Sequence, residues 1–367
     1  MTQKTDLLLQ SDPFEFSDES GQLFIDSFRE NALFHYNNHE FTKKLWDFFQ
    51  FHPEKILKEE DLREIPYTMV HLFKEHEFCS VSRDQVELTL TSSGTGGQKS
   101  VQYLSRKSLD NVKKLALSIH KSLGMVTENT YNYLCFTYDP HKASDLGTAF
   151  TDELLTNFTK KNEVYYAIEW REDKNKFELN EEGVLAALKR FEKSELPCRI
   201  LGFPALLYNL ILKYDIKVNL GLNSWLQTGG GWKNYEDKEI SKKDFRKFIV
   251  DRLGIPESHQ RDLFGMVEHG IPYVDCELGN LHIPNYARVF IRDPKTLKIL
   301  PEGDVGLAHF LCSYNFSYPA MSLLTTDYAR IGSCSCRIGG KVLELQGRAG
   351  VSKHKGCAIT ALEAARG

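Results

Sequence analysis

The sequence lacks the features that direct a protein to nucleic acid or into a membrane. Its 367 residues carry 46 basic and 50 acidic side chains, a formal net charge of -4, whereas nucleic-acid binding calls for a basic excess. No stretch approaches the roughly 20 apolar residues that span a bilayer, and the leucine run at 7–9 is shorter than a signal-peptide core. We therefore expect a cytoplasmic protein without a nucleic-acid partner or a transmembrane segment.

The cysteines are irregularly spaced. The eight cysteines include no paired CxxC motifs of the kind that build a structural zinc site. We interpret them as free thiols, as expected of a chain this long without a secretory signal. Cys334 and Cys336 could form a metal site with Cys312, but ordinary core and strand cysteines are the favoured interpretation.

A Ser/Gly-rich segment is the most informative feature that the sequence does contain. The segment TSSGTGGQKS at residues 91–100 follows an alternating run, VELTL at 86–90, that is typical of a strand. Its glycines let backbone N–H groups turn toward a ligand, its hydroxyls donate hydrogen bonds, and Lys99 supplies a mobile positive charge. It is neither a Walker A loop nor a Rossmann fingerprint, because Lys99 stands where each motif needs glycine. A polyphosphate-binding loop and an ordinary surface turn are both compatible with it.

Periodicities of two and 3.6 residues alternate through the middle of the chain. Strands are predicted at 131–138, 163–170, 199–201 and 224–227, and helices at 105–123, 181–193, 204–214 and 242–253. This alternation predicts an α/β protein in which helices flank mostly parallel sheets. Ligands bind such sheets in loops beyond the carboxyl ends of strands, and we expect both glycine clusters, at 91–100 and 228–232, at that kind of position.

The pattern changes from about Val274 onward. Short strands are predicted at 287–292, 305–312 and 341–345, joined by turns rich in Pro, Gly and Asp. They predict a small β-barrel or sheet appended to the α/β part.

Several short motifs in a fixed order carry a resemblance to a known family. After the Ser/Gly segment come TGGGW at 228–232, DLFGMVE at 262–268, TTD at 325–327 and QGR at 346–348. The series resembles the adenylate-forming superfamily of acyl-CoA synthetases and adenylation domains. Within it, the chain is more similar still to the LuxE-type acyl-protein synthetases. That similarity is carried by SDPF at 11–14, TSSGT at 91–95, TGGGWK at 228–233, YAR at 286–288, DPKTLK at 293–298, SYPA at 317–320 and KGCA at 355–358.

The resemblance implies a nucleotide site built from these motifs. The ATP-binding residues that it implies are Ser92, Ser93, Gly94, Thr95, Gly96, Gly97, Lys99, Gly229, Gly230, Gly231, Phe264, Asp327 and Arg348. Ser92, Ser93, Thr95 and Lys99 would contact phosphates. Gly229 to Gly231 would face adenine, and Phe264 would stack on it. Asp327 would hydrogen-bond the ribose hydroxyls, and Arg348 would contact the ribose or phosphate. Glu268, with Thr95, would bind Mg²⁺, which prefers hard oxygen ligands. Because a carboxylate attacking the α-phosphate of ATP brings negative charges together, a metal and a lysine are needed to offset the repulsion.

Cys357, near the end of the chain, is the candidate nucleophile. The resemblance implies that its thiol accepts the acyl group. Lys353, His354 and Lys355 precede it, and nearby positive charge lowers the pKa of a thiol. Lys355 or Lys353 would replace the lysine that a C-terminal lid domain supplies in other adenylate-forming enzymes. The alternative is a buried cysteine that packs a terminal helix.

The resemblance implies an ATP-dependent, AMP-forming acyl-protein synthetase with ATP and Mg²⁺ as cofactors. It would activate a long-chain fatty acid, load Cys357 and pass the acyl group to a partner such as an acyl reductase. We expect an adenylate-forming domain at 1–345, α/β to about 273 and β-rich at 274–345, and a tail at 346–367 in place of the usual C-terminal lid domain. The alternatives are an acyl- or aryl-CoA ligase of the phenylacetate type, a non-catalytic nucleotide-binding scaffold, and a zinc-stabilised binding module.

Overall fold

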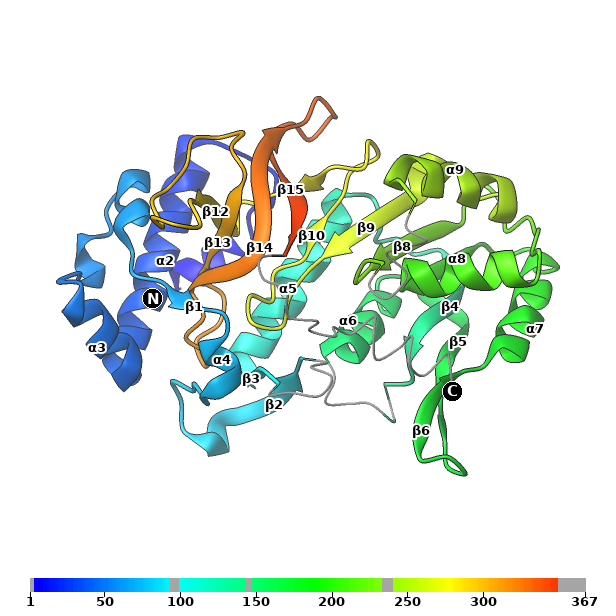
Figure 1. The fold of residues 1–367 in the computed structure, drawn as a ribbon, viewed down its shortest axis with the longest axis horizontal. Coiled ribbons are helices and arrows are strands. Elements are labelled where there is room, and N and C mark those ends of the chain that lie inside the picture. The colour runs from blue at the N-terminus through cyan, green and yellow to red at the C-terminus, as the bar shows by residue number, and fades with distance from the viewer. Residues whose placement is uncertain (1–2, 93–98, 141, 143–146, 233–239, 349–367) are drawn as a thin grey trace.

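Two sheets lie next to each other in the computed structural model (Figure 1), which describes residues 3–92, 99–140, 142, 147–232 and 240–348. Arg348 is described by its backbone alone. Other expected site residues lie outside the described ranges: Ser93, Gly94, Thr95, Gly96, Gly97, Lys355 and Cys357. Within the described ranges, no helix combines the length and the apolar character needed to cross a bilayer.

The larger sheet has seven strands and is mostly parallel. Its order is β10-β9-β8-β7-β4-β5-β6; β6 and β10 run antiparallel to their neighbours, and the other pairs are parallel. The strands are β4 (Thr130–Tyr138), β5 (Lys160–Arg171), β6 (Lys176–Leu179), β7 (Cys198–Gly202), β8 (Trp225–Gly229), β9 (Gln260–Phe264) and β10 (Tyr273–Val274). The predicted α/β class and parallel sheet are confirmed.

Helices cover both faces of this sheet, as the side chains of β4 show. Tyr133 and Cys135 of β4 belong to one core with the buried face of α5 (Arg106–Ser122), whereas Leu134 and Phe136 belong to a second core. Successive strand residues point to opposite faces, so a strand buried among both cores must be covered on each side. The second core contains apolar side chains of α7 (Glu181–Glu192), α8 (Pro204–Lys213) and α9 (Lys242–Leu253). The helix α6 (Gly147–Thr156) completes this part.

The smaller sheet has six strands and is mostly antiparallel. Its order is β11-β15-β14-β13-β12, with β1 parallel to β14. The strands are β1 (Thr68–Met69), β11 (Leu281–His282), β12 (Ala287–Arg292), β13 (Gly306–Cys312), β14 (Ser322–Ser333) and β15 (Lys341–Arg348). The β-rich region predicted after Val274 is therefore a sheet, and β12 has the predicted bounds.

N-terminal helices pack against the smaller sheet. Asn31 of α2 donates a 2.8 Å hydrogen bond from Nδ2 to the carbonyl of Asn315, and the hydroxyls of Ser27 and Ser313 lie 2.7 Å apart. The α-helices of this region are α1 (Lys4–Leu8), α2 (Asp18–Asn38), α3 (Glu40–Phe48) and α4 (Leu72–Glu75). Short 3-10 helices occur at Pro53–Lys55, Glu59–Glu64, Arg83–Gln85 and Glu257–His259.

The Ser/Gly segment lies on a separate two-stranded hairpin. Its strands, β2 (Val86–Thr91) and β3 (Val101–Ser105), are antiparallel. The expectation that this segment follows a strand of the parallel sheet is therefore wrong. The short run VQYLS between the glycines and α5 forms a returning strand, which sequence periodicity did not reveal.

Candidate active site

Two hydrogen bonds close the base of the Ser/Gly loop. The backbone N–H of Ser92 donates to the carbonyl of Ser100 at 3.0 Å, and the N–H of Ser100 donates to the Ser92 hydroxyl at 2.9 Å. Ser100 is fully buried, whereas Lys99 is exposed. The ends of the loop are thus fixed to each other.

The same loop base contacts Glu268. The Ser100 hydroxyl donates to Oε1 of Glu268, and the Glu268 side chain is 7% exposed. No lysine, arginine or histidine among the residues that the structure describes forms an ion pair with this carboxylate. A buried carboxylate calls for hydrogen bonds and a compensating cation, so Glu268 is suited to hold a metal ion beside the loop.

A second contact ties this region to α6. A Cβ atom placed on Gly147 would lie 2.7 Å from Cγ2 of Val267 and 3.7 Å from the carbonyl oxygen of Thr91. The first residue of α6 therefore packs closely between the end of β2 and the residue before Glu268. Sequence reasoning did not single out Gly147.

The glycine turn follows β8 at the carboxyl edge of the parallel sheet, as expected for the second glycine cluster. Gly229 is in register with Leu263 of β9, and a Cβ atom at Gly229 would lie 3.2 Å from the Leu263 carbonyl oxygen. Gly230 and Gly231 have φ angles of 81° and 72°, which disfavour side chains. The turn thus needs glycine and lies beside the strand that leads to Glu268.

A charged network that the sequence analysis missed fixes this edge. Nζ of Lys242 lies 3.3 Å from carboxylate oxygens of both Asp262 and Asp275, and the Thr228 hydroxyl donates to Oδ1 of Asp262 at 3.2 Å. Burial raises the pKa of Asp275 to about 6, although Lys242 opposes the shift. Burial also acts to lower the pKa of Lys242, but the two carboxylates outweigh it and raise that pKa. Asp262 is the first residue of the DLFGMVE motif, and this was the one sequence feature that pointed to the network.

Phe264 is the last residue of β9 and is partly exposed. Its ring centroid lies 6.0 Å from that of Tyr273 and 6.1 Å from that of Phe310. One side of the ring is therefore supported by aromatic packing, while part of it remains accessible for stacking.

Asp327 and Arg348 are cross-strand partners in the smaller sheet. They pair in the register of β14 and β15, so the two expected ribose-binding positions, 21 residues apart in the sequence, lie opposite each other. Asp327 is 6% exposed, and its backbone N–H donates to the Thr325 hydroxyl at 3.2 Å. In Figure 1, the carboxyl end of β9 points toward β14 and β15. The two groups of expected residues thus come from different sheets.

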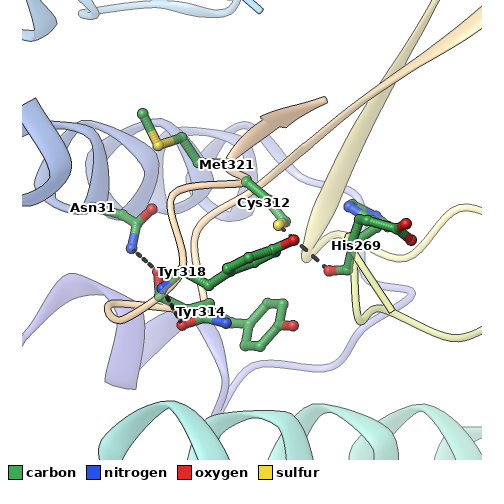
Figure 2. Close-up of a pocket in the computed structure, with 9 residues that line it drawn as sticks. Asn31, His269, Cys312, Tyr314, Tyr318 and Met321 are labelled. Atoms are coloured by element: carbon green, nitrogen blue, oxygen red, sulfur yellow. Dashed lines mark hydrogen bonds between the residues drawn. The ribbon is translucent and has the colours of Figure 1, made fainter. Parts of the chain in front are cut away.

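A small pocket, shown in Figure 2, has Glu268 among its lining residues. Its lining residues are Asn31, Glu268, His269, Cys312, Tyr314, Asn315, Tyr318, Ala320 and Met321. The Tyr314 hydroxyl accepts a 3.0 Å hydrogen bond from Gln102 of β3. Burial lowers the pKa of His269 to about 3, so its imidazole is neutral. The surroundings of Glu268 are therefore largely uncharged.

Comparison with known proteins identifies the family. The model of the family described as acyl-protein synthetase, LuxE, matches residues 1–365. The chain belongs to the LuxE family of acyl-protein synthetases. It is therefore an ATP-dependent ligase.

Two relatives match along most of this LuxE-family chain. A long-chain-fatty-acid--luciferin-component ligase of Aliivibrio fischeri is 26% identical over 366 residues, covering 97% of this chain and 92% of its own. The protein of the same name from Vibrio harveyi is 25% identical over 373 residues, covering 99% and 94%. Both are named as ligases of long-chain fatty acids.

Solved structures agree on the fold. A 2-hydroxyisobutyryl-CoA ligase in its postadenylation state superposes with a TM-score of 0.71 at 12% identity, over 92% of this chain and 69% of that one. The same ligase in its thioesterification state gives 0.68 at 14% identity, over 92% and 70%. At such identities the likeness shows the fold alone, and it confirms the expected adenylate-forming architecture.

Proposed function

We propose that this protein activates a long-chain fatty acid with ATP as an acyl-adenylate, loads the acyl group onto Cys357 and delivers it to a partner such as an acyl reductase in the cytoplasm. The names of both relatives support the fatty acid as substrate. The observation that carries the proposal is the buried contact between Ser100 and Glu268. It joins the base of a phosphate-binding loop to a carboxylate suited to a metal.

In the first step, a carboxylate oxygen of the fatty acid attacks the α-phosphorus of ATP, and the bond to the pyrophosphate leaving group breaks. The Ser/Gly loop holds the phosphates through hydroxyls, backbone N–H groups and a lysine. The residues in this role are Ser92, Ser93, Gly94, Thr95, Gly96, Gly97 and Lys99. Fixed donors of this kind stabilise charge that develops in the transition state.

The remaining nucleotide contacts come from the two sheet edges. The turn from Gly229 through Gly231 lets the backbone approach adenine, and Phe264 stacks on the base. Asp327 accepts hydrogen bonds from the ribose hydroxyls, and Arg348 contacts ribose or phosphate. The cross-strand pairing of Asp327 with Arg348 supports their common role.

Glu268 and Thr95 are the proposed Mg²⁺ ligands. A carboxylate and a hydroxyl are hard oxygen donors of the kind that Mg²⁺ binds together with water and phosphate oxygens. When bound, the ion would neutralise phosphate charge next to the Ser/Gly loop. Glu268 fits this role because it is buried and its described neighbours leave its charge uncompensated.

In the second step, the Cys357 thiolate attacks the acyl carbon of the adenylate, the bond to the AMP oxygen breaks, and AMP leaves with the electron pair. The product is a thioester on this chain. The positive charge of Lys355 favours the thiolate. A thiol of the partner then takes the acyl group by thioester exchange.

Acyl labelling tests this assignment. The protein is incubated with ATP, Mg²⁺ and clickable tetradecanoic acid, and label that hydroxylamine removes is measured on the chain. The wild type and the control variant Cys79→Ser should both be labelled. The variant Cys357→Ser should keep ATP–pyrophosphate exchange but lose the label.

Each other outcome has a defined meaning. Label that survives Cys357→Ser would remove the nucleophile assignment. Exchange without label, together with product formation on free CoA, would favour a CoA ligase. Nucleotide binding without exchange would indicate a non-catalytic scaffold.

A further inference from the structure

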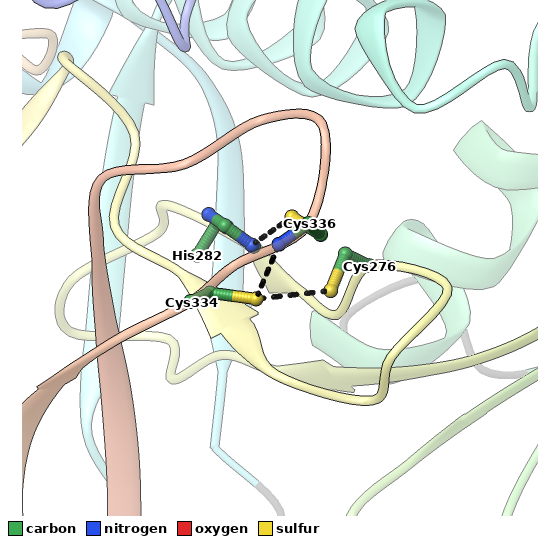
Figure 3. A group of neighbouring side chains, drawn as sticks. All are labelled: Cys276, His282, Cys334 and Cys336. Carbon is green, nitrogen blue, oxygen red and sulfur yellow. Dashed lines mark hydrogen bonds between the residues drawn. The ribbon is translucent and has the colours of Figure 1, made fainter.

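Figure 3 shows four neighbouring side chains of the types that bind metal ions, none of which belongs to the candidate active site described above. Cys276 follows β10, His282 lies in β11, and Cys334 and Cys336 lie between β14 and β15. Their four ligand atoms lie within 4.8 Å of one another. Two stretches more than 50 residues apart in the sequence thus supply three sulfurs and one imidazole nitrogen to one cluster.

The spacing of these atoms suits ligands that share a tetrahedral ion. Sulfur ligands about 2.3 Å from a tetrahedral Zn²⁺ stand about 3.8 Å from each other. The Sγ atoms of Cys276 and Cys334 lie 3.8 Å apart, and Sγ of Cys336 lies 3.2 Å from Nε2 of His282. Cys276 and Cys334 are free thiols in this arrangement.

We propose that Cys276, His282, Cys334 and Cys336 bind a structural Zn²⁺ ion. Three thiolates and one imidazole form a closed set of four ligands, which is typical of structural rather than catalytic zinc. Soft sulfur ligands also select against Mg²⁺ and Ca²⁺. The site is separate from the proposed Mg²⁺ ligand Glu268, and it does not depend on the proposed acyl transfer.

Hydrogen bonds around Cys334 support a thiolate there. Its Sγ accepts from Nδ2 of Asn280 at 3.3 Å and from the backbone N–H of Cys336 at 3.5 Å. Such outer contacts orient metal ligands and stabilise their charge. Cys276 and His282 are buried, whereas Cys334 and Cys336 are partly exposed, so an ion can enter from the side of the β14–β15 connection.

The cluster differs from the one that the sequence suggested. Cys312, the expected third ligand, instead places its Sγ 3.8 Å from the carbonyl oxygen of His269 in the pocket of Figure 2. The favoured interpretation of Cys334 and Cys336 as ordinary cysteines is also replaced by this proposal. His282 joins them because β11 pairs with β15. Cys276 joins them because the β-bridge between Asp275 and Leu281 holds it beside β11.

The ion would connect the two sheets. β10 belongs to the sheet that carries Phe264, whereas β14 and β15 carry Asp327 and Arg348. Cys276 also follows Asp275, which is held by Lys242 at the edge of the larger sheet. Zinc at this position would fix the connection between the two groups of proposed nucleotide-binding residues.

Metal analysis of the full-length protein tests the proposal. After purification without chelators, mass spectrometry of the metals should find about one Zn²⁺ per chain. The variant Cys336→Ser should lower zinc occupancy on the order of 10-fold or more after dialysis against a weak chelator. The matched variant Cys79→Ser changes a partly exposed cysteine outside the cluster and should keep the zinc.

A second measurement avoids variants that fail to fold. Wild-type protein grown or refolded with Co²⁺ should show the strong ligand-field and thiolate charge-transfer absorption of a tetrahedral site. Wild-type protein that binds neither Zn²⁺ nor Co²⁺ would overturn the proposal, as would a disulfide between Cys276 and Cys334 found by non-reducing peptide mapping. Iron at equal stoichiometry would overturn the assignment to zinc.

Discussion

The two glycine-bearing segments have similar compositions but are held in place differently. The Ser/Gly loop rests on an isolated hairpin, and its base is tied to the rest of the fold by the buried contact from Ser100 to Glu268. The turn at 229–231 follows β8, whose position is set by parallel pairing with β7 and β9. Glycine content therefore indicates where the backbone can approach a ligand. It does not indicate whether a hairpin or a parallel sheet holds that backbone in place.

The largest expected effect comes from removing the charge of Glu268, which contacts the base of the Ser/Gly loop. Glu268→Gln keeps an oxygen that can accept from Ser100, so the fold should persist while metal binding is lost. We expect ATP–pyrophosphate exchange to fall by about 100-fold, with the exposed variant Asp304→Asn as control. Exchange unchanged at saturating MgATP would remove Glu268 from the site.

A smaller effect is expected at the glycine turn. Alanine variants of two glycines with positive φ, Gly231 in the turn and Gly221 outside it, separate backbone strain from an effect on ATP binding. Gly231 and Gly221 have φ angles of 72° and 87°, and a Cβ atom on either would meet no heavy atom within 4 Å. Alanine at each position should destabilise the fold by about 1–2 kcal/mol in urea unfolding. We expect Gly231→Ala alone to raise KM for ATP, by about 10-fold. Equal KM changes in the two variants would mean that the turn does not contact nucleotide.

The smallest effect concerns the buried surroundings of Glu268, and it appears in the pH dependence of stability. Burial lowers the folded-state pKa of His269 to about 3, below the value of about 6.5 in the unfolded chain. Because only the unfolded state takes up this proton between those values, stability is lost as pH falls from about 6.5 toward 3. His269→Gln should flatten this loss by at most about 1.4 kcal/mol per pH unit. Urea unfolding of the wild type and of His269→Gln at pH 7 and pH 5 measures how much stability each loses. An equal loss of unfolding free energy in the two proteins would contradict a buried neutral histidine.

Local periodicity predicted much of the larger part of the fold. Every strand and helix predicted from residue 105 to 253 forms within a few residues of its expected bounds. At α9, the Ser241 hydroxyl accepts from the N–H of Asp244, which caps the helix where its predicted range begins. These elements carry clear apolar repeats between strong stop signals, so local sequence was sufficient.

Three features were missed, two because they depend on distant partners and one because a local signal was overlooked. The strand β14, which carries Asp327, is buried along much of its length because β13 and β15 flank it. The helix α2 buries Phe24, Phe28 and Ala32 at a spacing of four, a readable signal that sequence analysis overlooked. The Cys/His cluster arises from the pairing of β11 with β15 and from the bridge between Asp275 and Leu281, and no spacing in the sequence encodes the first of these.

The contacts of α2 also bear on how the chain is made. Ser27 and Asn31 find their partners at Ser313 and Asn315, so this early helix cannot complete its packing until almost the whole polypeptide has left the ribosome. Because synthesis proceeds at about 5–20 residues per second, the apolar side chains of α2 lack these later partners for roughly 15–60 s. During synthesis, these exposed side chains are where a chaperone would bind and where aggregation would begin.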